Sequence, residues 1–247
     1  MTRVLQFGQH QLHIFSDLAA LSIGTAEYVN SLVQTTSPFY ISLSGGSTPK
    51  RLYECLVEMT VSSTLLNQWH VFWGDERYVA HDHVQSNYKM ACDAWLNKVP
   101  IPAQQIHPIP THCDDIADCV AQYQQLLTHL PTQDGYPCFD LVLLGIGDDG
   151  HTASLFPDTS ILQNYQDSVA SVYVDKLAAW RVSLTYPILN HAKKVLVLVS
   201  GEGKAEILQH VISGTQKGYP IQSIDNPNGM LWFVDEAAAR LIESCGS

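Results

Sequence analysis

Phe139-Asp-Leu-Val-Leu-Leu-Gly-Ile-Gly-Asp-Asp-Gly-His-Thr-Ala-Ser-Leu-Phe-Pro157 is the stretch that decides the fold. Leu141–Leu144 is apolar without alternation, which is typical of a strand buried on both faces of a parallel sheet. The glycines that follow permit sharp turns and let backbone N–H groups approach a small ligand. His151 arrives with Asp148 and Asp149 at the carboxyl end of the strand, where open α/β sheets bind ligands. The stretch therefore predicts an α/β fold with a proton-transfer site at that edge.

The same glycines also match another pattern. Gly145-x-Gly147-x-x-Gly150 after a strand is the dinucleotide-binding fingerprint, with Asp167 downstream as a candidate ribose ligand. Asp148 and Asp149, however, would place negative charge where a pyrophosphate should lie. Pro157 leaves little room for the long crossover helix that the fingerprint requires. The two acids and the proline therefore disfavour NAD as a cofactor.

Length and charge limit the remaining possibilities. The chain has 247 residues, of which 46% are hydrophobic, and this fits one large α/β domain over residues 1–247. Its net charge is −11, from 24 acids against 13 lysines and arginines. There is no basic stripe, so nucleic acid and anionic membranes are disfavoured as partners. An anionic ligand would need basic contacts that are concentrated locally.

Cellular location is inferred from two weaker signals. No apolar stretch reaches the length of a signal peptide or a membrane span. The six cysteines are scattered without a C-x-x-C pair, at Cys55, Cys92, Cys113, Cys119, Cys138 and Cys245. We interpret them as reduced thiols in a cytoplasmic protein.

Apolar strand patterns alternate with helical patterns, which predicts a mostly parallel sheet covered on both faces. Strands are predicted over residues 11–15, 39–43, 69–73, 139–144, 169–174, 195–199 and 231–234. Helices are predicted over 17–33, after Pro49, over 87–96 and 115–130, after Gly201, and from near Asp235 to the C-terminus.

Residues suited to chemistry follow four of the predicted strands, and they are Ser44–Thr48, Asp75–Arg77, Asp149–His151 and Gly201–Lys204. Carboxyl ends of parallel strands meet at one edge of a sheet, so we expect these four groups to form one site.

The first group belongs to Ser44-Gly-Gly-Ser-Thr-Pro-Lys50, which joins a strand to a helix. Gly45 and Gly46 free backbone N–H groups, Ser44 and Thr48 carry hydroxyls, and the helix dipole favours an anion. The loop lacks the P-loop pattern. Phosphate binding is favoured over an ordinary capped turn.

The other groups are ambiguous by themselves. Asp75-Glu-Arg77 taken alone is more typical of a solvated ion-pair cluster, whereas Lys204 fits a phosphate contact and a surface lysine equally well. Arg181 precedes an alternating apolar stretch and indicates nothing alone. His81-Asp-His83 contains metal-ligand types without a standard zinc spacing, so a metal site is disfavoured.

Taken together, these motifs resemble a known family. They are Leu43–Pro49, Trp73–Arg77, Asp82 with Ser86-Asn-Tyr88, Gly145–Pro157, Arg181–Thr185, Gly201–Lys204 and Trp232–Asp235. The chain is similar in them to the 6-phosphogluconolactonases of the glucosamine/galactosamine-6-phosphate isomerase superfamily. The resemblance implies a three-layer α/β/α fold around a mainly parallel, Rossmann-like open sheet, similar to glucosamine-6-phosphate deaminase.

Some differences separate the chain from the deaminases, and one separates it from the usual lactonase pattern. Deaminases usually carry Asp-Glu-Tyr where this chain has Asp75-Glu-Arg77, and they have a glutamate after Gly-His where this chain continues Thr152-Ala-Ser-Leu-Phe-Pro157. In the stretch 220–229, Asp225-Asn-Pro-Asn228 replaces the basic residue usual in the lactonases. A deaminase or isomerase and a non-catalytic sugar-phosphate-binding protein remain the alternative functions.

The resemblance implies hydrolysis of 6-phospho-D-glucono-1,5-lactone to 6-phospho-D-gluconate, the second step of the oxidative pentose phosphate pathway. His151 would be the base, Asp149 would orient it, and Arg77 would hold the substrate or the oxyanion. The phosphate would be bound by Ser44, Gly45, Gly46, Thr48, Arg181 and Lys204. No metal or organic cofactor is implied, and we expect a monomer or a weak homodimer.

Overall fold

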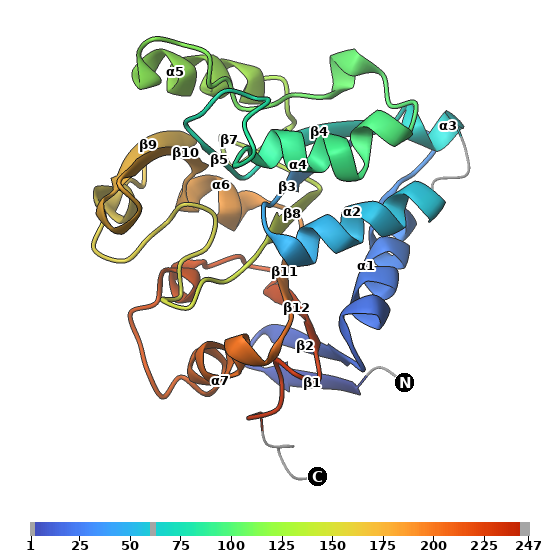
Figure 1. Cartoon of the computed structure of the whole chain (residues 1–247), viewed down its shortest axis with the longest axis vertical. Coiled ribbons are helices and arrows are strands. Elements are labelled where there is room, and N and C mark those ends of the chain that lie inside the picture. Colours follow the sequence, from blue (N-terminus) through green and yellow to red (C-terminus); the bar gives the residue numbers. More distant parts are fainter. Residues whose placement is uncertain (1–2, 60–62, 243–247) are drawn as a thin grey trace.

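A computed structural model of the chain describes residues 3–59 and 63–242 (Figure 1). A central sheet runs through the molecule, with helices on either side. In Figure 1, α1 (Leu18–Leu32) and α2 (Ser47–Met59) lie to one side of the sheet, and α6 (Tyr186–His191) and α7 (Ala205–Ser213) lie to the other. The predicted α/β class is confirmed. Further elements are α3 (Ser63–Leu66), α4 (Asn87–Ala94), α5 (Ile116–Leu127), β6 (Thr132–Gln133) and β7 (Tyr136–Pro137).

The central sheet has seven strands in the order β1-β2-β12-β11-β8-β3-β4. Only the edge strand β1 is antiparallel to its neighbour, so the mainly parallel sheet is also confirmed. The strands are β1 (Arg3–Phe7), β2 (His10–Phe15), β3 (Phe39–Leu43), β4 (Trp69–Trp73), β8 (Leu141–Leu144), β11 (Val195–Val199) and β12 (Met230–Asp235).

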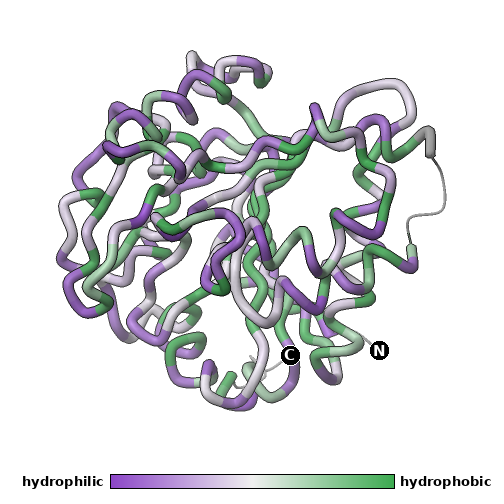
Figure 2. The backbone as a smooth tube through the Cα atoms, turned by 45° about the horizontal axis from the view of Figure 1, so that its top comes forward, coloured by the Kyte–Doolittle hydropathy of each residue, from purple (hydrophilic) through white to green (hydrophobic). Residues whose placement is uncertain are grey.

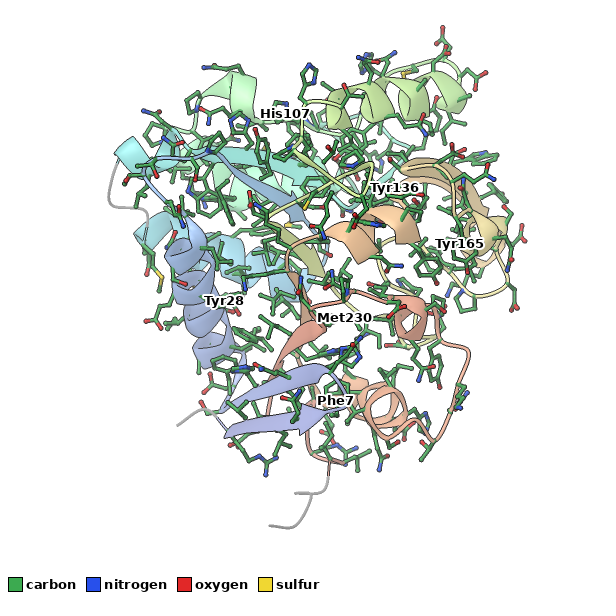
Figure 3. All side chains as sticks on the ribbon, turned by 180° about the vertical axis from the view of Figure 1, so that it is seen from behind. Phe7, Tyr28, His107, Tyr136, Tyr165 and Met230 are labelled. Carbon is green, nitrogen blue, oxygen red and sulfur yellow. A yellow bond between two sulfur atoms is a disulfide. The ribbon has the colours of Figure 1, made fainter. Side chains whose placement is uncertain are left out.

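The middle of this sheet is the hydrophobic core. Every residue of β8 and β11 is buried, as expected of central strands covered on both faces. The backbone coloured by hydropathy shows these apolar segments inside, with hydrophilic segments around them (Figure 2). Tyr28 from α1 packs on the sheet, its ring centroid 5.4 Å from that of Phe233 (Figure 3).

The direction of winding reverses between β3 and β8. From β3 the chain proceeds to β4 on one side, whereas β8, β11 and β12 follow one another on the other side. At such a reversal, the loops that leave the carboxyl ends of the two strands diverge and open a crevice. The loop beginning at Ser44 and the loop beginning at Gly145 are the two that diverge here.

A second, antiparallel sheet extends over this crevice. It has the order β5-β10-β9 and is formed by β5 (Asp75–Arg77), β10 (Ala179–Leu184) and β9 (Val169–Val174). The strand predicted over 169–174 is therefore real but lies outside the central sheet. Gly74 makes the junction, because its N–H donates to Leu43 O and its carbonyl accepts from Leu184 N, each at 2.8 Å.

The helix predicted from near Asp235 is wrong for the described residues, because 236–241 form turns. The Asp235 carboxylate accepts from the N–H of Ala238 at 2.8 Å and from the N–H of Gly201 at 3.0 Å. The side chain expected to start a helix thus fastens the last strand to the loop after β11. The remainder, 243–247, lies outside the described residues.

The prediction that all cysteines are reduced is also wrong. Cys113 and Cys119 form a disulfide, with their Cα atoms 5.8 Å apart. Cys113 precedes Asp115, the N-cap of α5, and Cys119 lies early in that helix, so the helix start brings them together. Within the described residues Cys55, Cys92 and Cys138 are free thiols, and Cys245 lies outside that part.

Among residues 3–59 and 63–242, no helix combines the length and apolar character that crossing a membrane would require.

Candidate active site

The four groups of residues that follow predicted strands meet in one cleft. It has a volume of about 470 Å³ and lies at the carboxyl ends of the strands, at the winding reversal between β3 and β8. Its lining includes Ser44, Arg77, His151, Lys176, Arg181 and Lys204. The expected convergence at one sheet edge is therefore present in the fold.

The cleft concentrates positive charge. Four of the chain's 13 lysines and arginines line it, whereas Asp75 is the one acid among its lining residues. The whole chain carries a net charge of −11, so cations are enriched among the lining residues, although Lys176 and Lys204 are paired with Asp149 and Asp148. A locally positive site favours an anionic ligand.

His151 is held by Asp149. The imidazole Nδ1 lies 2.5 Å from Asp149 Oδ1, and the Asp149 carboxylate also accepts a hydrogen bond from Lys176. Burial opposes ionisation of Asp149, but the hydrogen bonds from Lys176 and His151 outweigh it and lower its pKa to about 2. An ionised carboxylate only accepts hydrogen bonds, so Nδ1 carries the hydrogen of this contact, and in the neutral imidazole the lone pair is then at Nε2. This is the arrangement that a general base needs.

Two further residues fix the imidazole. The ring of Phe156 stacks on it, with centroids 4.0 Å apart and planes inclined by 25°. A Cβ atom at Gly147 would lie 2.0 Å from the imidazole Nδ1 and Cε1, so a larger residue there would displace His151. Gly147 is therefore needed for the close packing of the imidazole, in addition to the turn that the glycines permit.

Asp148 has a different partner from Asp149. Its side chain is 84% exposed, and its Oδ1 lies 2.5 Å from Lys204 Nζ. The structure therefore distinguishes the two acids, because Asp149 contacts the imidazole and Asp148 contacts Lys204. Lys204 lines the cleft, where its ammonium group is balanced by Asp148.

The loop at Ser44 is rigidly held at the start of α2. The Tyr53 hydroxyl donates to Ser44 O at 2.7 Å, and Ser44 N–H donates back to it at 3.0 Å. A Cβ atom at Gly45 would lie 2.0 Å from Asn87 Oδ1, which makes glycine necessary there. Ser44, Gly45 and the adjacent Gly46 line the cleft, so their backbone and the start of a 13-residue helix face it.

Thr48 is engaged with the neighbouring loop. Its Oγ1 lies 2.8 Å from Ser200 Oγ, directly after β11. This contact joins the loop after β3 to the loop that leads to Lys204. In this structure the Thr48 hydroxyl therefore fastens two loops of the cleft to one another.

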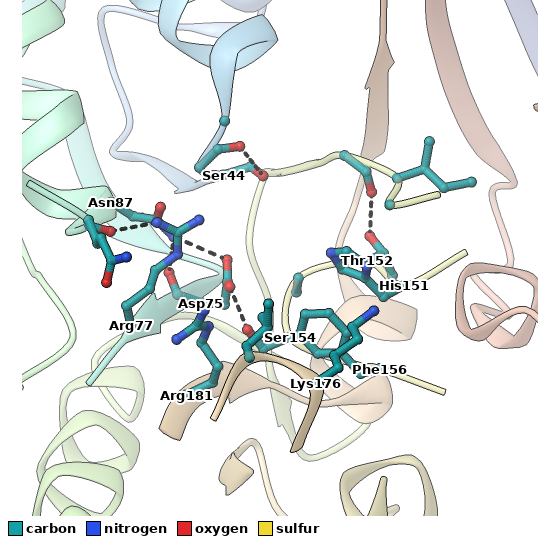
Figure 4. A pocket seen from close by; sticks show the side chains of 18 of the residues that line it. Ser44, Asp75, Arg77, Asn87, His151, Thr152, Ser154, Phe156, Lys176 and Arg181 are labelled. Carbon is teal, nitrogen blue, oxygen red and sulfur yellow. Dashed lines mark hydrogen bonds between the residues drawn. The ribbon is translucent and has the colours of Figure 1, made fainter. Parts of the chain in front are cut away.

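Arg77 and Arg181 lie side by side. They are directly opposite each other in the pairing of β5 with β10, and Figure 4 shows both near Asp75, across the cleft from His151. Burial lowers the pKa of Arg181, and the positive charge of Arg77 lowers it further. Arg77 Nη1 donates to Gln85 O at 2.5 Å, which fixes the direction of its guanidinium group. Two adjacent cations are well suited to a multiply charged anion.

The two acids before Arg77 support the backbone. Asp75 accepts from Ser154 Oγ at 2.6 Å, and thereby connects β5 to the loop after His151 (Figure 4). Glu76 is only 1% exposed, and it accepts from the N–H groups of Asn87 and Tyr88 at 2.8 and 2.7 Å, at the start of α4. The solvated ion-pair interpretation of this cluster is therefore wrong.

The histidines once considered as metal ligands make structural contacts. His81 Nε2 lies 2.9 Å from Ile109 O, and His83 Nδ1 accepts from Gln85 N at 3.1 Å.

The loop that departs from the lactonase pattern, 220–229, has a structural role at Asn226. This residue is buried and donates to Ala192 O at 2.7 Å. Asn226 thus supports the turn after α6.

Sequence reasoning missed Lys176, Phe156 and Ser154, all of which line the cleft. Lys176 comes from the turn between β9 and β10 and carries no local motif. Phe156 and Ser154 lie within the stretch that decides the fold, and their spacing from His151 was the only available signal.

A family model and the sequences of known proteins both match this chain over most of its length. Residues 17–233 match the family described as glucosamine-6-phosphate isomerases/6-phosphogluconolactonase. The chain is 42% identical over 214 residues to a 6-phosphogluconolactonase of Nostoc sp., and this match covers 85% of the chain and 87% of the relative.

Solved structures agree. The crystal structure of devB protein has a TM-score of 0.88 and 35% identity, covering 95% of this chain and all 100% of that one. The crystal structure of 6-phosphogluconolactonase from Leishmania guyanensis has a TM-score of 0.83 and 29% identity, covering 94% and 98% of the two chains. The likeness extends over nearly the whole length of each chain.

Proposed function

The chain belongs to the family of glucosamine-6-phosphate isomerases and 6-phosphogluconolactonases, and from this membership we propose that it hydrolyses 6-phospho-D-glucono-1,5-lactone to 6-phospho-D-gluconate. The observation that carries the proposal is the pairing of His151 with Asp149 in the same cleft as Arg77 and Arg181. A base with a free lone pair thus shares one site with cations suited to a phosphorylated acid.

The proposed reaction begins with water bound at His151. Nε2 accepts a proton from the water as its oxygen attacks the lactone carbonyl, and Asp149 stabilises the resulting imidazolium. The carbonyl oxygen becomes an oxyanion, which Arg77 stabilises. The bond from the carbonyl carbon to the ring oxygen then breaks, and the imidazolium returns its proton to that oxygen. The new carboxylic acid ionises, so one proton is released for each lactone hydrolysed.

We assign the phosphate of the substrate to the basic residues and backbone N–H groups that line the cleft around His151. The N–H groups of the Ser44–Gly46 loop, Arg181 and Lys204 would hold it. The dianion would take the place of the exposed Asp148 carboxylate as the partner of Lys204, exchanging one anion for another. Thr48 would act by holding this loop to Ser200.

The residues after His151 favour hydrolysis over deamination. Thr152 Oγ1 donates to Gly145 O at 2.8 Å, and Ser154 Oγ donates to Asp75. These hydroxyls hold the loop where a deaminase would continue toward its glutamate. The Asp149–His151 pair has no use in a protein that only binds a sugar phosphate, and this disfavours the non-catalytic alternative.

A pH-stat assay with freshly prepared 6-phosphogluconolactone tests the proposal. Proton release well above the spontaneous rate of hydrolysis is expected, without ammonia release from glucosamine 6-phosphate. Ammonia release, or binding of the lactone without faster hydrolysis, would contradict it.

Lys204→Ala is expected to raise KM for the phosphorylated lactone roughly tenfold, because a charge-assisted contact to phosphate is lost. Hydrolysis of unphosphorylated gluconolactone should change little, since that substrate never makes the contact. Lys193→Ala is the matched control, because it removes another exposed lysine paired with an aspartate, Asp140. Equal losses on both substrates would show that Lys204 does not act through phosphate.

A further inference from the structure

Lys176 reaches the catalytic end of the cleft from a separate part of the fold. It lies in η4 (Asp175–Leu177), the turn between β9 and β10, and its side chain lines the cleft (Figure 4). Its ammonium group donates to Asp149 Oδ2, while His151 Nδ1 is 2.5 Å from Oδ1 of the same carboxylate. One carboxylate therefore joins the lysine to the imidazole.

Lys176 also contacts the aromatic ring that stacks on the imidazole. Its Nζ lies 4.7 Å from the centroid of the Phe156 ring, within the range of a cation–π contact. The imidazole of His151 stacks on the same ring, at a centroid distance of 4.0 Å. Lys176 thus touches both groups that hold the imidazole, the carboxylate at its edge and the aromatic ring at its face.

We propose that Lys176 is a positioning residue for lactone hydrolysis, which holds Asp149 and Phe156 against His151 so that Nε2 keeps its direction and its lone pair. The assignment rests on the proposed function. With Lys176 absent, Asp149 Oδ2 loses this partner, and the carboxylate is held through Oδ1 alone, by the ring and the backbone N–H of His151. Its charge would then act on the imidazole without compensation, and this favours the imidazolium, which cannot accept a proton.

A second lysine–aspartate pair also lies at this cleft. Asp148 and Lys204 pair with each other, and the Asp148 side chain is 84% exposed. The two lysine–aspartate pairs therefore predict different kinetics. Lys204 should act on KM through the phosphate, whereas Lys176 should act on kcat through the base.

Kinetics of Lys176→Met and Lys176→Arg test this assignment. Lys176→Met keeps most of the length of the unbranched side chain without its charge, and we expect a kcat roughly tenfold lower with a nearly constant KM. The acid limb of its pH profile for kcat/KM should move to higher pH, by about half a unit or more. Lys176→Arg should restore most of both properties. Lys89→Met, which removes the surface pair with Asp93, is the matched control and should behave like the parent.

A second measurement does not depend on activity. Long-range ¹H–¹⁵N NMR spectra report which imidazole nitrogen carries the proton, and the His151 signals are assigned by their loss in a His151 variant. The parent should show the Nδ1–H form, and Lys176→Met should show a larger imidazolium fraction at the same pH.

The outcomes separate this inference from the proposed function. A parent without lactonase activity would refute the function, while the NMR comparison would still test the coupling of Lys176 to His151. An unchanged His151 signal in Lys176→Met would overturn the inference whatever the activity. A loss confined to KM would also overturn it, because Lys176 would then be a substrate ligand.

Discussion

Replacing His151 with alanine is expected to lower kcat by about 100-fold or more, which is the usual scale for the loss of a general base. KM for the phosphorylated lactone should change little, because the imidazole lies across the cleft from Arg77 and Arg181. The pH-stat assay, corrected for spontaneous hydrolysis, measures both constants. His129→Ala is the control, since His129 is exposed at the end of α5 and lies outside the lining of the cleft.

The pH dependence of the parent enzyme provides a check on the same residue. Asp149, with a pKa of about 2, stays ionised throughout the range in which the protein is assayed. A fall in activity on acidification would therefore not come from Asp149, and the proposed mechanism assigns it to the base, His151. A His151→Ala variant with near-parent turnover, or a flat profile from about pH 5 to 8, would remove His151 from the role of base.

Arg77→Lys is expected to lower kcat/KM by roughly 10- to 100-fold although the charge is kept. The guanidinium group is directed by its hydrogen bond to Gln85 O at 2.5 Å, which leaves other N–H groups of the planar fork available to substrate oxygens. A lysine ammonium cannot both keep that contact and present a second donor in fixed geometry. Arg51→Lys, at a surface pair with Glu54, is the control.

The substrate comparison decides what Arg77 binds. Arg181 lies directly across the strand pair, so a single phosphate near both could accept from both. If Arg77 acts on the sugar-acid end, as we propose, Arg77→Lys should impair phosphorylated and unphosphorylated lactones alike. A loss limited to the phosphorylated substrate would assign Arg77 to the phosphate, and parent-like activity would exclude it from both roles.

The central sheet was predictable because its signal is local. β3 and β4 begin and end where the mainly apolar segments do, at 39–43 and 69–73, since buried parallel strands are predominantly apolar and end at turn residues. The edge where the site lies was also predictable, because parallel strands place the loops after their carboxyl ends together. β5 and β10 carried no comparable signal. β5 has three residues, and it is a strand only because β10 pairs with it.

The sequence by itself determined the α/β class, the strands of the central sheet except the edge strand β1, and the residue types that gather at its carboxyl edge. Only the tertiary structure decided which partners those residues have. It paired Asp149 with His151 and Asp148 with Lys204, although both acids are adjacent in the sequence. It also brought Lys176 to Asp149 across a separation of 27 residues and joined Cys113 to Cys119. Such contacts depend on side-chain directions and on the packing of distant segments, and neither has a periodicity that a sequence displays.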